Sequence, residues 1–328
     1  MSIVLDLPIG RVADPALPTL ALALDPFRVE TLLRLHVTGL LGGADLRLES
    51  LALVRHKPGR RAMVEYRVTV DGVPAALLGK LRGRGADRRA FAALHGFRAQ
   101  GFAEPADVVV PEPVALLEPL GMLLMRRMPG TPFLQRTDRA AAVAAALTRL
   151  QSAVPTTTRI HGGADELATL ERELGHAAGS RPWLARRLGA VLEAVAPLTR
   201  RLDAGPQAAL HRDFYHEQVL VDGDRLVLLD LDCHAIGHPA IDAGNFIGHL
   251  MELELRGAAA PGAHAGAIAA FRDRWLAGAA GGSAAALEDC VTLTLARHAG
   301  LAGRLPGRAH AQPAVLAMVE RRLAGEVA

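Results

Sequence analysis

The sequence predicts an α+β protein in which a small antiparallel β-sheet is followed by a mainly helical region. Residues 46–56, 62–70 and 74–81 read as three strands, and the Asp-Gly turn between the last two favours antiparallel pairing. From Thr137 onward, helix-forming segments alternate with Gly, Pro and Thr breaks. A length of 328 residues also suggests about two domains.

The remaining elements are expected in a simple order. Residues 1–24 form an irregular lead-in, and 108–120 form an edge strand or loop because they contain Pro111 and Pro113. An apolar strand at 122–128 then runs into a Pro-Gly pair. Helices are expected at 26–37, 87–100, 138–153, 164–176, 182–202, 241–255, 264–277, 283–302 and 313–324.

Most of the chemical information lies between residues 209 and 249. Two short apolar runs, 219–221 and 226–229, flank an Asp-Gly-Asp turn and predict a β-hairpin. Asp213 and Gln218 precede its first strand, and Asp230 lies at the end of its second strand. The hairpin therefore brings two carboxylates and an amide oxygen to one end of a rigid element. Such oxygens suit a hard cation such as Mg²⁺.

The sequence His211-Arg212-Asp213, with Gln218 five residues later and Asp230 at a strand end, resembles the catalytic core of the protein-kinase-like fold. The segment from Asp230 to Asp242, with its Gly-His-Pro, is similar to the aminoglycoside phosphotransferase and choline kinase branch. That family usually has Asn at the position of Gln218 and Asp at the position of His238. Members of the maltokinase type also carry Gln at the first of these positions.

The resemblance implies a bilobal fold and an ATP-dependent small-molecule kinase. Residues 1–128 would form the N-lobe, a nucleotide-covering sheet and helix. Residues 129–328 would form the C-lobe, with the catalytic loop, the metal site and the substrate helices. The rival interpretation is a catalytically weak, nucleotide-binding pseudokinase with a regulatory role, suggested by Gln218, by His238 and by the lack of a Glu in the first helix after the sheet.

In the C-lobe, the resemblance implies that Asp213 is the catalytic base and that Gln218 and Asp230 hold Mg²⁺. Asp232 either shares the metal, if it lies on the same face of an extended segment, or caps the next segment. His211 is expected to support the loop, although a role as proton carrier stays open, and Arg212 to pair with a carboxylate or to face solvent. Asp242 is expected to open a helix and to bind backbone amides of the catalytic loop.

In the N-lobe, the two lysines of the chain are the main candidates for nucleotide binding. Of 37 Lys and Arg residues only Lys57 and Lys80 are lysine, and a compact ammonium is not interchangeable with a guanidinium in a tight phosphate site. The resemblance implies that Lys80 binds phosphates, with Asp87 either orienting it or capping the next helix. The turn at Lys57 would cover the phosphates, or it is a plain basic hairpin. Backbone groups near Arg126 and Met128 would bind adenine, unless this segment is only a crossover.

The acceptor is expected to be a small hydroxyl compound. Only twelve residue steps separate Asp230 from Asp242, which leaves no room for the long activation segment of a protein kinase. The region after Asp242 is not acidic, so a neutral or anionic acceptor such as a sugar fits better than a polycationic aminoglycoside. The charged residues behind this argument are Glu252, Glu254, Asp273, Glu288 and Asp289 against Arg256, Arg272, Arg274, Arg297, Arg304 and Arg308. The sequence leaves open the acceptor's identity, the choice of ATP or GTP, and the oligomeric state.

Composition argues against several other classes. Scattered basic residues, a pI of about 9.3 and an aromatic content of 4% do not favour nucleic-acid binding. No apolar run approaches the roughly 20 residues of a membrane span, and the N-terminus lacks a signal-peptide pattern. Two cysteines favour a reducing cytoplasm. A transition-metal site is the weaker alternative, because its candidates match no standard zinc spacing: His216, Cys233, His234 and His238.

Overall fold

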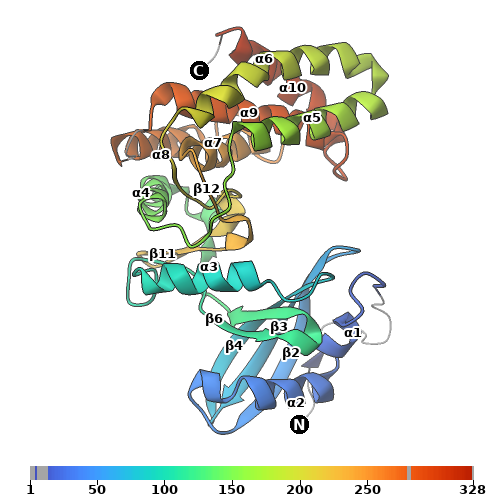
Figure 1. Cartoon of the computed structure of the whole chain (residues 1–328), viewed down its shortest axis with the longest axis vertical. Helices are drawn as coiled ribbons and strands as arrows, with labels where there is room; N and C mark the ends of the chain where they lie inside the picture. Colours follow the sequence, from blue (N-terminus) through green and yellow to red (C-terminus); the bar gives the residue numbers. More distant parts are fainter. Residues whose placement is uncertain (1–3, 6–13, 279–281, 327–328) are drawn as a thin grey trace. The chain divides into compact units, whose positions relative to one another are not determined.

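The computed structural model describes residues 4–5, 14–278 and 282–326. The chain divides into two compact units, Met1–Pro129 and Gly130–Ala328. The first unit contains an antiparallel sheet and the second is mostly helical, so the predicted α+β class is confirmed (Figure 1).

In the described part of the first unit, one sheet has the strand order β1-β2-β3-β4-β7-β6. All neighbours pair antiparallel except β1, which runs parallel to β2. The strands β2 to β4 lie where alternation predicted them, and β6 is an edge strand as its prolines required. The bounds are β1 Val4–Leu5, β2 Leu46–Lys57, β3 Arg61–Val70, β4 Val73–Arg82, β6 Pro113–Leu117 and β7 Met122–Arg126, with a two-residue β5 at Val108–Val109.

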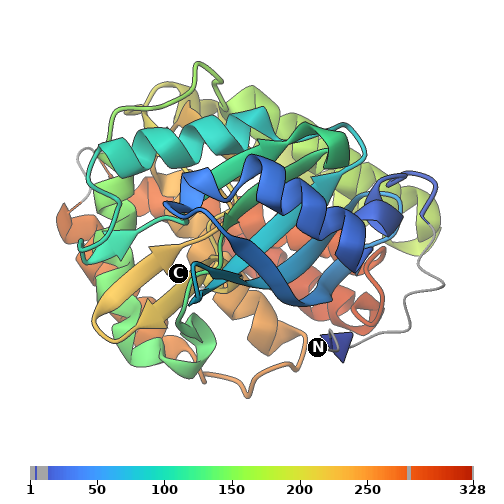
Figure 2. The same cartoon turned by 90° about the horizontal axis from the view of Figure 1, so that it is seen from below.

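Helix α2 (Pro26–His36) lies across this sheet, as Figure 2 shows. Asp25 caps its N-terminus by accepting hydrogen bonds from two backbone amides of the first turn. Val29 and Leu33 are fully buried in the apolar core that the sheet shares with this helix. The lead-in is less irregular than predicted, because it contains a short helix α1 (Leu20–Ala23). Helix α3 (Arg88–Ala99) follows β4.

Seven α-helices are described in the second unit: α4 Ala140–Gln151, α5 Gly163–Ser180, α6 Ala185–Asp203, α7 Ala240–Leu255, α8 Ala265–Gly278, α9 Ala284–Ala302 and α10 Gln312–Leu323. Figure 1 shows α5, α6 and α10 gathered around α9. Helices α7 and α9 approach closely because α7 carries glycines at the contact. A Cβ at Gly244 would lie 2.4 Å from the Cβ of Cys290. This close packing places side chains of α9 beside the loops that enter α7.

Short strands fix those loops. Strands β10 (Val219–Asp222) and β11 (Arg225–Leu228) form the predicted hairpin, and Gly223 takes the positive φ that its turn requires. Strand β8 (Thr131–Pro132) pairs with β10. Strand β9 (Ala208–Leu210), which leads into His211, pairs with β12 (Ala235–Gly237).

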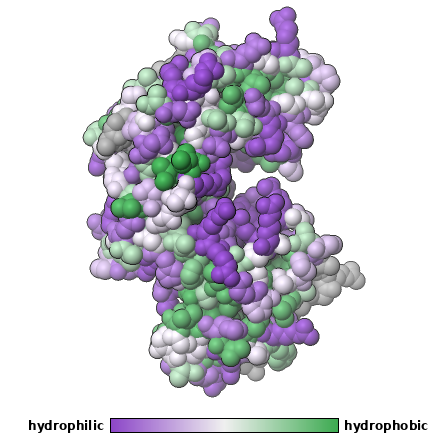
Figure 3. Space-filling view, viewed as in Figure 1, coloured by the Kyte–Doolittle hydropathy of each residue, from purple (hydrophilic) through white to green (hydrophobic). Residues whose placement is uncertain are grey.

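Ion pairs neutralise much of the charge in the second unit. Glu252 contacts both Arg256 and Arg308, and Arg304 lies 2.7 Å from Glu173. Figure 3 shows a mainly hydrophilic surface over these helices. The acidic and basic groups used to argue for the acceptor's charge therefore largely balance each other, and a local pocket must decide the question. None of the described helices is long and apolar enough to cross a membrane.

Candidate active site

A buried carboxylate from α7 holds the loop of residues 211–213. Asp242 accepts a hydrogen bond of 2.7 Å from the backbone N–H of His211 and one of 2.6 Å from that of Arg212. Its side chain is fully buried, and burial raises its pKa to about 6 against the opposing effects of His211 and the two amides. The predicted contact between Asp242 and the loop amides is confirmed.

The His211 ring ties the same loop to the end of the hairpin. Its Nε2 lies 2.6 Å from the carbonyl oxygen of Leu229, and since a carbonyl only accepts, Nε2 carries the proton. The ring also packs edge-on against Phe214. No described residue bonds to its other nitrogen, Nδ1. These contacts give His211 a positioning role for the residues on either side.

Asp213 projects from this loop as an open acceptor. Its carboxylate takes no hydrogen bond from any residue that the structure describes. Burial raises the pKa of Asp213, and the nearby Asp230 raises it further, against the lowering effects of His211 and Arg297. Asp213 and Asp230 therefore lie close enough to interact electrostatically, as the hairpin geometry predicted.

Gln218 is joined to the same end of the hairpin. It closes a 3₁₀ turn at His216–Gln218, and its carbonyl accepts a 2.9 Å hydrogen bond from the N–H of Leu229, which precedes Asp230. The side chain is 7% exposed, yet its amide bonds to none of the described residues. Its oxygen is therefore available to a ligand.

The expected extended conformation around Asp232 is wrong. Asp230 adopts left-handed backbone angles, with φ 60° and ψ 58°, and residues Leu231–Cys233 then form a 3₁₀ turn. The backbone turns at once after Asp230, so Asp230 and Asp232 do not share one face of a strand.

The histidines near this turn serve the backbone. His234 Nδ1 donates to the carbonyl of Leu210 at 2.8 Å, and its Nε2 accepts from the N–H of Thr156. His238 accepts from the N–H of Ala240. Among the described residues, no three His, Cys, Asp or Glu side chains are grouped to hold a metal ion. A magnesium site here would therefore depend on the Gln218 amide in addition to the two aspartates.

Lys80 lies in β4 of the first unit and is 4% exposed. It is in register with Met63 of β3 and Leu123 of β7. Because side chains alternate along strands, Lys80 faces away from the side of Leu77 and Leu81, which belong to the core under α2. Lys80 is thus on the sheet face that α2 does not cover.

Asp87 caps α3 by accepting from the N–H of Ala90, and it forms an ion pair with Arg82 at 3.3 Å. The capping alternative is therefore the one that the structure shows.

The turn after Lys57 is held by an acidic residue that the sequence did not single out. Asp14 accepts a 2.9 Å hydrogen bond from the N–H of Gly59, and Nε2 of His56 lies 2.9 Å from the same oxygen. The Gly59 amide and the His56 contact lower the pKa of Asp14. Nothing marks Asp14 in the sequence, because it lies more than 40 residues from the turn.

Arg126 ends β7, and its side chain is paired with Glu112. The N–H of Arg126 donates to the carbonyl of Glu112, and that of Arg127 donates to the carbonyl of Ala76. The N–H of Met128, just beyond the strand, bonds to no group in the described part of the chain. Met128 therefore offers a backbone donor where the resemblance expects one.

A family model described as the phosphotransferase enzyme family matches residues 84–281, more than half of the chain. This match includes Asp213, Gln218, Asp230 and Asp242. The chain belongs to the phosphotransferase enzyme family.

Solved structures support the fold of this phosphotransferase. Choline kinase LicA from Streptococcus pneumoniae is 12% identical, with a TM-score of 0.60 over 90% of this chain and 99% of that one. Choline kinase from Cryptosporidium parvum Iowa II is 10% identical, with a TM-score of 0.58 over 92% and 97%. A thermostable mutant of aminoglycoside phosphotransferase APH(4)-Ia is 15% identical, with a TM-score of 0.58 over 84% and 95%. Related structures hold AMP, or ADP with hygromycin B. No curated protein matches the sequence.

Three polar residues of the second unit that sequence reasoning did not assign to the site also lie near the Asp213 loop of this phosphotransferase. Asn245 donates to the carbonyl of Phe214 at 2.9 Å and accepts from Arg297. Glu166 accepts a 2.6 Å hydrogen bond from His161. Asn245 could have been found, since it lies three residues after Asp242 and therefore near the same helix face. Glu166 and His161 carry no local signal.

A cluster of buried rings lies beneath Gln218 in this phosphotransferase. His249 stacks on Tyr215 at 4.4 Å and meets His298 edge-on at 4.5 Å, while His216 lies 6.1 Å from His249. Burial lowers the pKa of His216 to about 4 and that of His298 to about 3. The rings are therefore neutral near pH 7.

These histidines should make the protein lose stability in mild acid. In the unfolded chain they take up protons below about pH 6.5, whereas the folded chain does not until pH 4 or below. The free energy of unfolding should then fall by about 1.4 kcal/mol per pH unit for each histidine. Denaturant titrations from pH 7.5 to 4.5 should show a flatter pH dependence for His298→Phe. The exposed His176→Gln is the control, and an equal slope in all three proteins would contradict this account.

Proposed function

We propose that this protein transfers the γ-phosphate of ATP to a hydroxyl group of a small molecule, in the presence of Mg²⁺. The observation that carries the proposal is the loop that Asp242 holds, which presents an open Asp213 carboxylate beside Asp230 and Gln218. Phosphoryl transfer needs little covalent chemistry from the protein beyond an oriented hydroxyl and neutralised charge. Membership in the phosphotransferase enzyme family supports the reaction class.

Asp213 is proposed as the base that accepts the hydroxyl proton. Its carboxylate has no competing donor among the described residues, and burial raises its pKa, which makes it a better proton acceptor than an exposed aspartate. His211 fixes the loop through the Leu229 carbonyl and does not face the reaction as a proton carrier.

Gln218 and Asp230 are proposed as ligands of Mg²⁺, with Asp232 as a third candidate. The donors fit this ion because they are carboxylate and amide oxygens, and because the Gln218 amide is not engaged by the described protein. When bound, Mg²⁺ neutralises the negative charge of the phosphates. The protein's own contribution is to hold these oxygens at the end of a short hairpin.

The first unit is proposed to bind the nucleotide. Lys80 would contact phosphates from the sheet face that α2 leaves uncovered, the turn at Lys57 would lie over them, and the Met128 amide beside Arg126 would meet the adenine edge. The AMP and ADP complexes of similar proteins support this role.

The second candidate function is a nucleotide-binding pseudokinase. It is favoured by Gln218 and by α3, whose sequence contains no acidic residue to orient Lys80. ATP turnover measured with sugars, hydroxy acids, amino alcohols and aminoglycosides separates the two candidates. Mg²⁺-dependent phosphorylation of one acceptor class is expected. ATP binding without turnover on any acceptor would favour the pseudokinase.

The substitution Lys80→Arg should weaken ATP use. A guanidinium cannot reproduce the compact charge of an ammonium, so we expect the KM for ATP to rise or kcat to fall by roughly tenfold, the equivalent of about 1.4 kcal/mol. Steady-state kinetics with varied ATP measures this effect. Arg47→Lys, at an exposed strand position, is the reverse exchange and should change nothing. Unchanged kinetics in Lys80→Arg would remove this lysine from the nucleotide site.

A further inference from the structure

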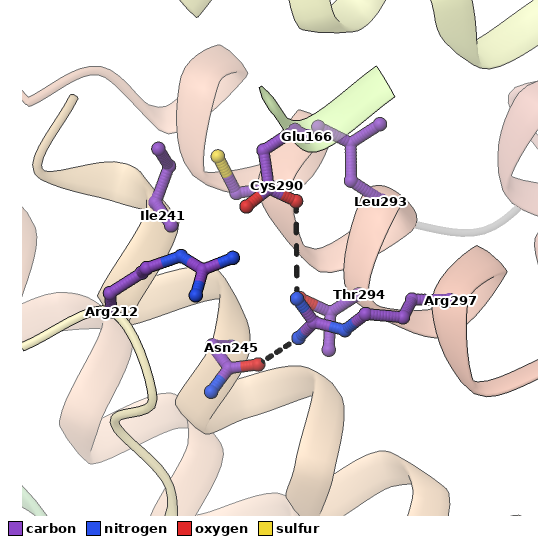
Figure 4. Close-up of a pocket in the computed structure, with 8 residues that line it drawn as sticks. All are labelled: Glu166, Arg212, Ile241, Asn245, Cys290, Leu293, Thr294 and Arg297. Carbon is purple, nitrogen blue, oxygen red and sulfur yellow. Dashed lines mark hydrogen bonds and ion pairs between the residues drawn. The ribbon is translucent and has the colours of Figure 1, made fainter. Parts of the chain in front are cut away.

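A small pocket in the second unit lies among α5, α7, α9 and the 211–213 loop (Figure 4). Its empty volume is about 250 Å³, which is below the usual size of a drug-binding pocket and fits a small organic group better than an oligosaccharide. The lining residues are Glu166, Arg212, Ile241, Asn245, Cys290, Leu293, Thr294 and Arg297.

Two guanidinium groups face this pocket with unused donors. Arg212 donates from Nε to Nδ1 of His161 at 3.1 Å, and no described residue accepts from its two terminal nitrogens, which Figure 4 shows directed into the pocket. Arg297 donates from Nη2 to Asn245, while its Nη1 lies 3.9 Å from Glu166. That separation is too long for a hydrogen bond.

The protein holds both arginines in place. Asn245 bridges Arg297 to the carbonyl of Phe214, next to Asp213. Because Nδ1 of His161 accepts from Arg212, its Nε2 must carry the proton that Glu166 accepts at 2.6 Å. The guanidinium groups are therefore pre-organised, which lowers the entropic cost of binding a ligand between them.

The charge of the lining favours an anion. Burial alone would raise the pKa of Glu166, but the His161 hydrogen bond and the charges of Arg297, His161 and Arg212 together lower it, so the carboxylate is ionised. Burial keeps the Cys290 thiol neutral by raising its pKa. Two positive groups thus face one negative group, and an oxyanion would satisfy the donors that the protein leaves unused.

The pocket adjoins the candidate base. Arg212 directly precedes Asp213, and the charges of Arg212 and Arg297 both lower the pKa of Asp213. Building on the proposed function, we propose that the acceptor is an anionic hydroxyl compound. Its carboxylate or phosphate group binds Arg212 and Arg297, and its hydroxyl group is thereby presented to Asp213. The apolar side chains of Ile241 and Leu293 would contact its short carbon skeleton.

Calorimetric titration of the protein without ATP tests this proposal. The probes are glycerate and gluconate as carboxylates, glycerol 3-phosphate and glucose 6-phosphate as phosphates, glycerol and glucose as neutral counterparts, and choline as a cation. We expect one of the anion classes to bind at least roughly tenfold more tightly than its neutral counterpart, and binding to weaken as salt is added. The two anion classes distinguish a carboxylate from a phosphate ligand. Equal binding of the neutral compounds, or binding of choline alone, would overturn the proposal.

Two substitutions should act in opposite directions. Arg212→Gln removes a positive donor and should weaken binding of the anion by roughly tenfold or more. Glu166→Gln keeps an acceptor for His161 but removes the opposing charge, so it should tighten binding of the same anion. If both variants bind the anion like the unaltered protein, the pocket is not its site. Melting temperatures of both variants show whether they are folded.

The same panel in an ATP turnover assay separates this proposal from the proposed function. Anion binding without phosphorylation would leave the pocket assignment intact and contradict the kinase activity. Phosphorylation of neutral compounds with no preference for anions would support the kinase and contradict the pocket assignment.

Discussion

Replacing Asp213 by Asn should lower kcat by about 100-fold or more while leaving the affinity for ATP unchanged. The amide keeps the size and polarity of the side chain but cannot accept the hydroxyl proton. Since His211, Arg212 and Asp242 hold the loop through other atoms, the variant should fold normally. Single-turnover kinetics and equilibrium ATP binding measure the two quantities separately.

The pH dependence gives a second reading of the same residue. Asp213 acts only when deprotonated, and burial raises its pKa, so kcat/KM should fall on the acid side at a pH above the ordinary aspartate value of 3.8. This acid limb should be absent from the residual activity of Asp213→Asn. Asp224→Asn, at the exposed hairpin turn, is the matched control. Full activity of Asp213→Asn would exclude Asp213 as the base.

Replacing Gln218 by Leu should abolish Mg²⁺-dependent ATP turnover, whereas replacing it by Asn should weaken it only modestly. Asn retains an amide oxygen but is one methylene shorter, and Mg²⁺ requires ligands at about 2.1 Å. Leu has no oxygen to offer. The position is buried and the amide has no partner among the described residues, so Leu should not cost the fold a hydrogen bond.

Turnover measured against Mg²⁺ concentration, with melting temperature as the folding control, decides the role of Gln218. Normal Mg²⁺ dependence in Gln218→Leu would falsify the assignment of the amide as a ligand. The metal site would then have to be built from Asp230 and Asp232. That outcome would not favour the pseudokinase, because turnover would persist.

Local patterns made much of the fold predictable. Strands β2 to β4 alternate in the sequence, and the β10–β11 hairpin is marked by an Asp-Gly-Asp turn between apolar runs. Helix ends were also close, since Ser283 caps α9 and Asp25 caps α2 as such residues do. The error at Asp232 arose because a left-handed residue at Asp230 redirects the chain, and a non-glycine residue gives no warning of that conformation.

The candidate site divides in the same way. Asp213, Gln218 and Asp230 lie within one short stretch, so a motif and a hairpin sufficed to group them. Arg297 and Glu166 reach the Asp213 loop from distant helices, and only the packing of α5, α7 and α9 brings them there. Their roles depend on contacts between segments far apart in the sequence, which one sequence alone does not reveal.

Arg212 has φ of 68°, in the left-handed region where a side chain costs roughly 1 kcal/mol and glycine costs almost nothing. The backbone at this position thus asks for glycine, and the side chain is retained against that preference. Because Asp242 grips the Arg212 amide and not its side chain, a glycine here would leave the loop anchored. The guanidinium is in this sense a detachable module, and acceptor choice in this scaffold becomes separable from loop architecture by a single codon.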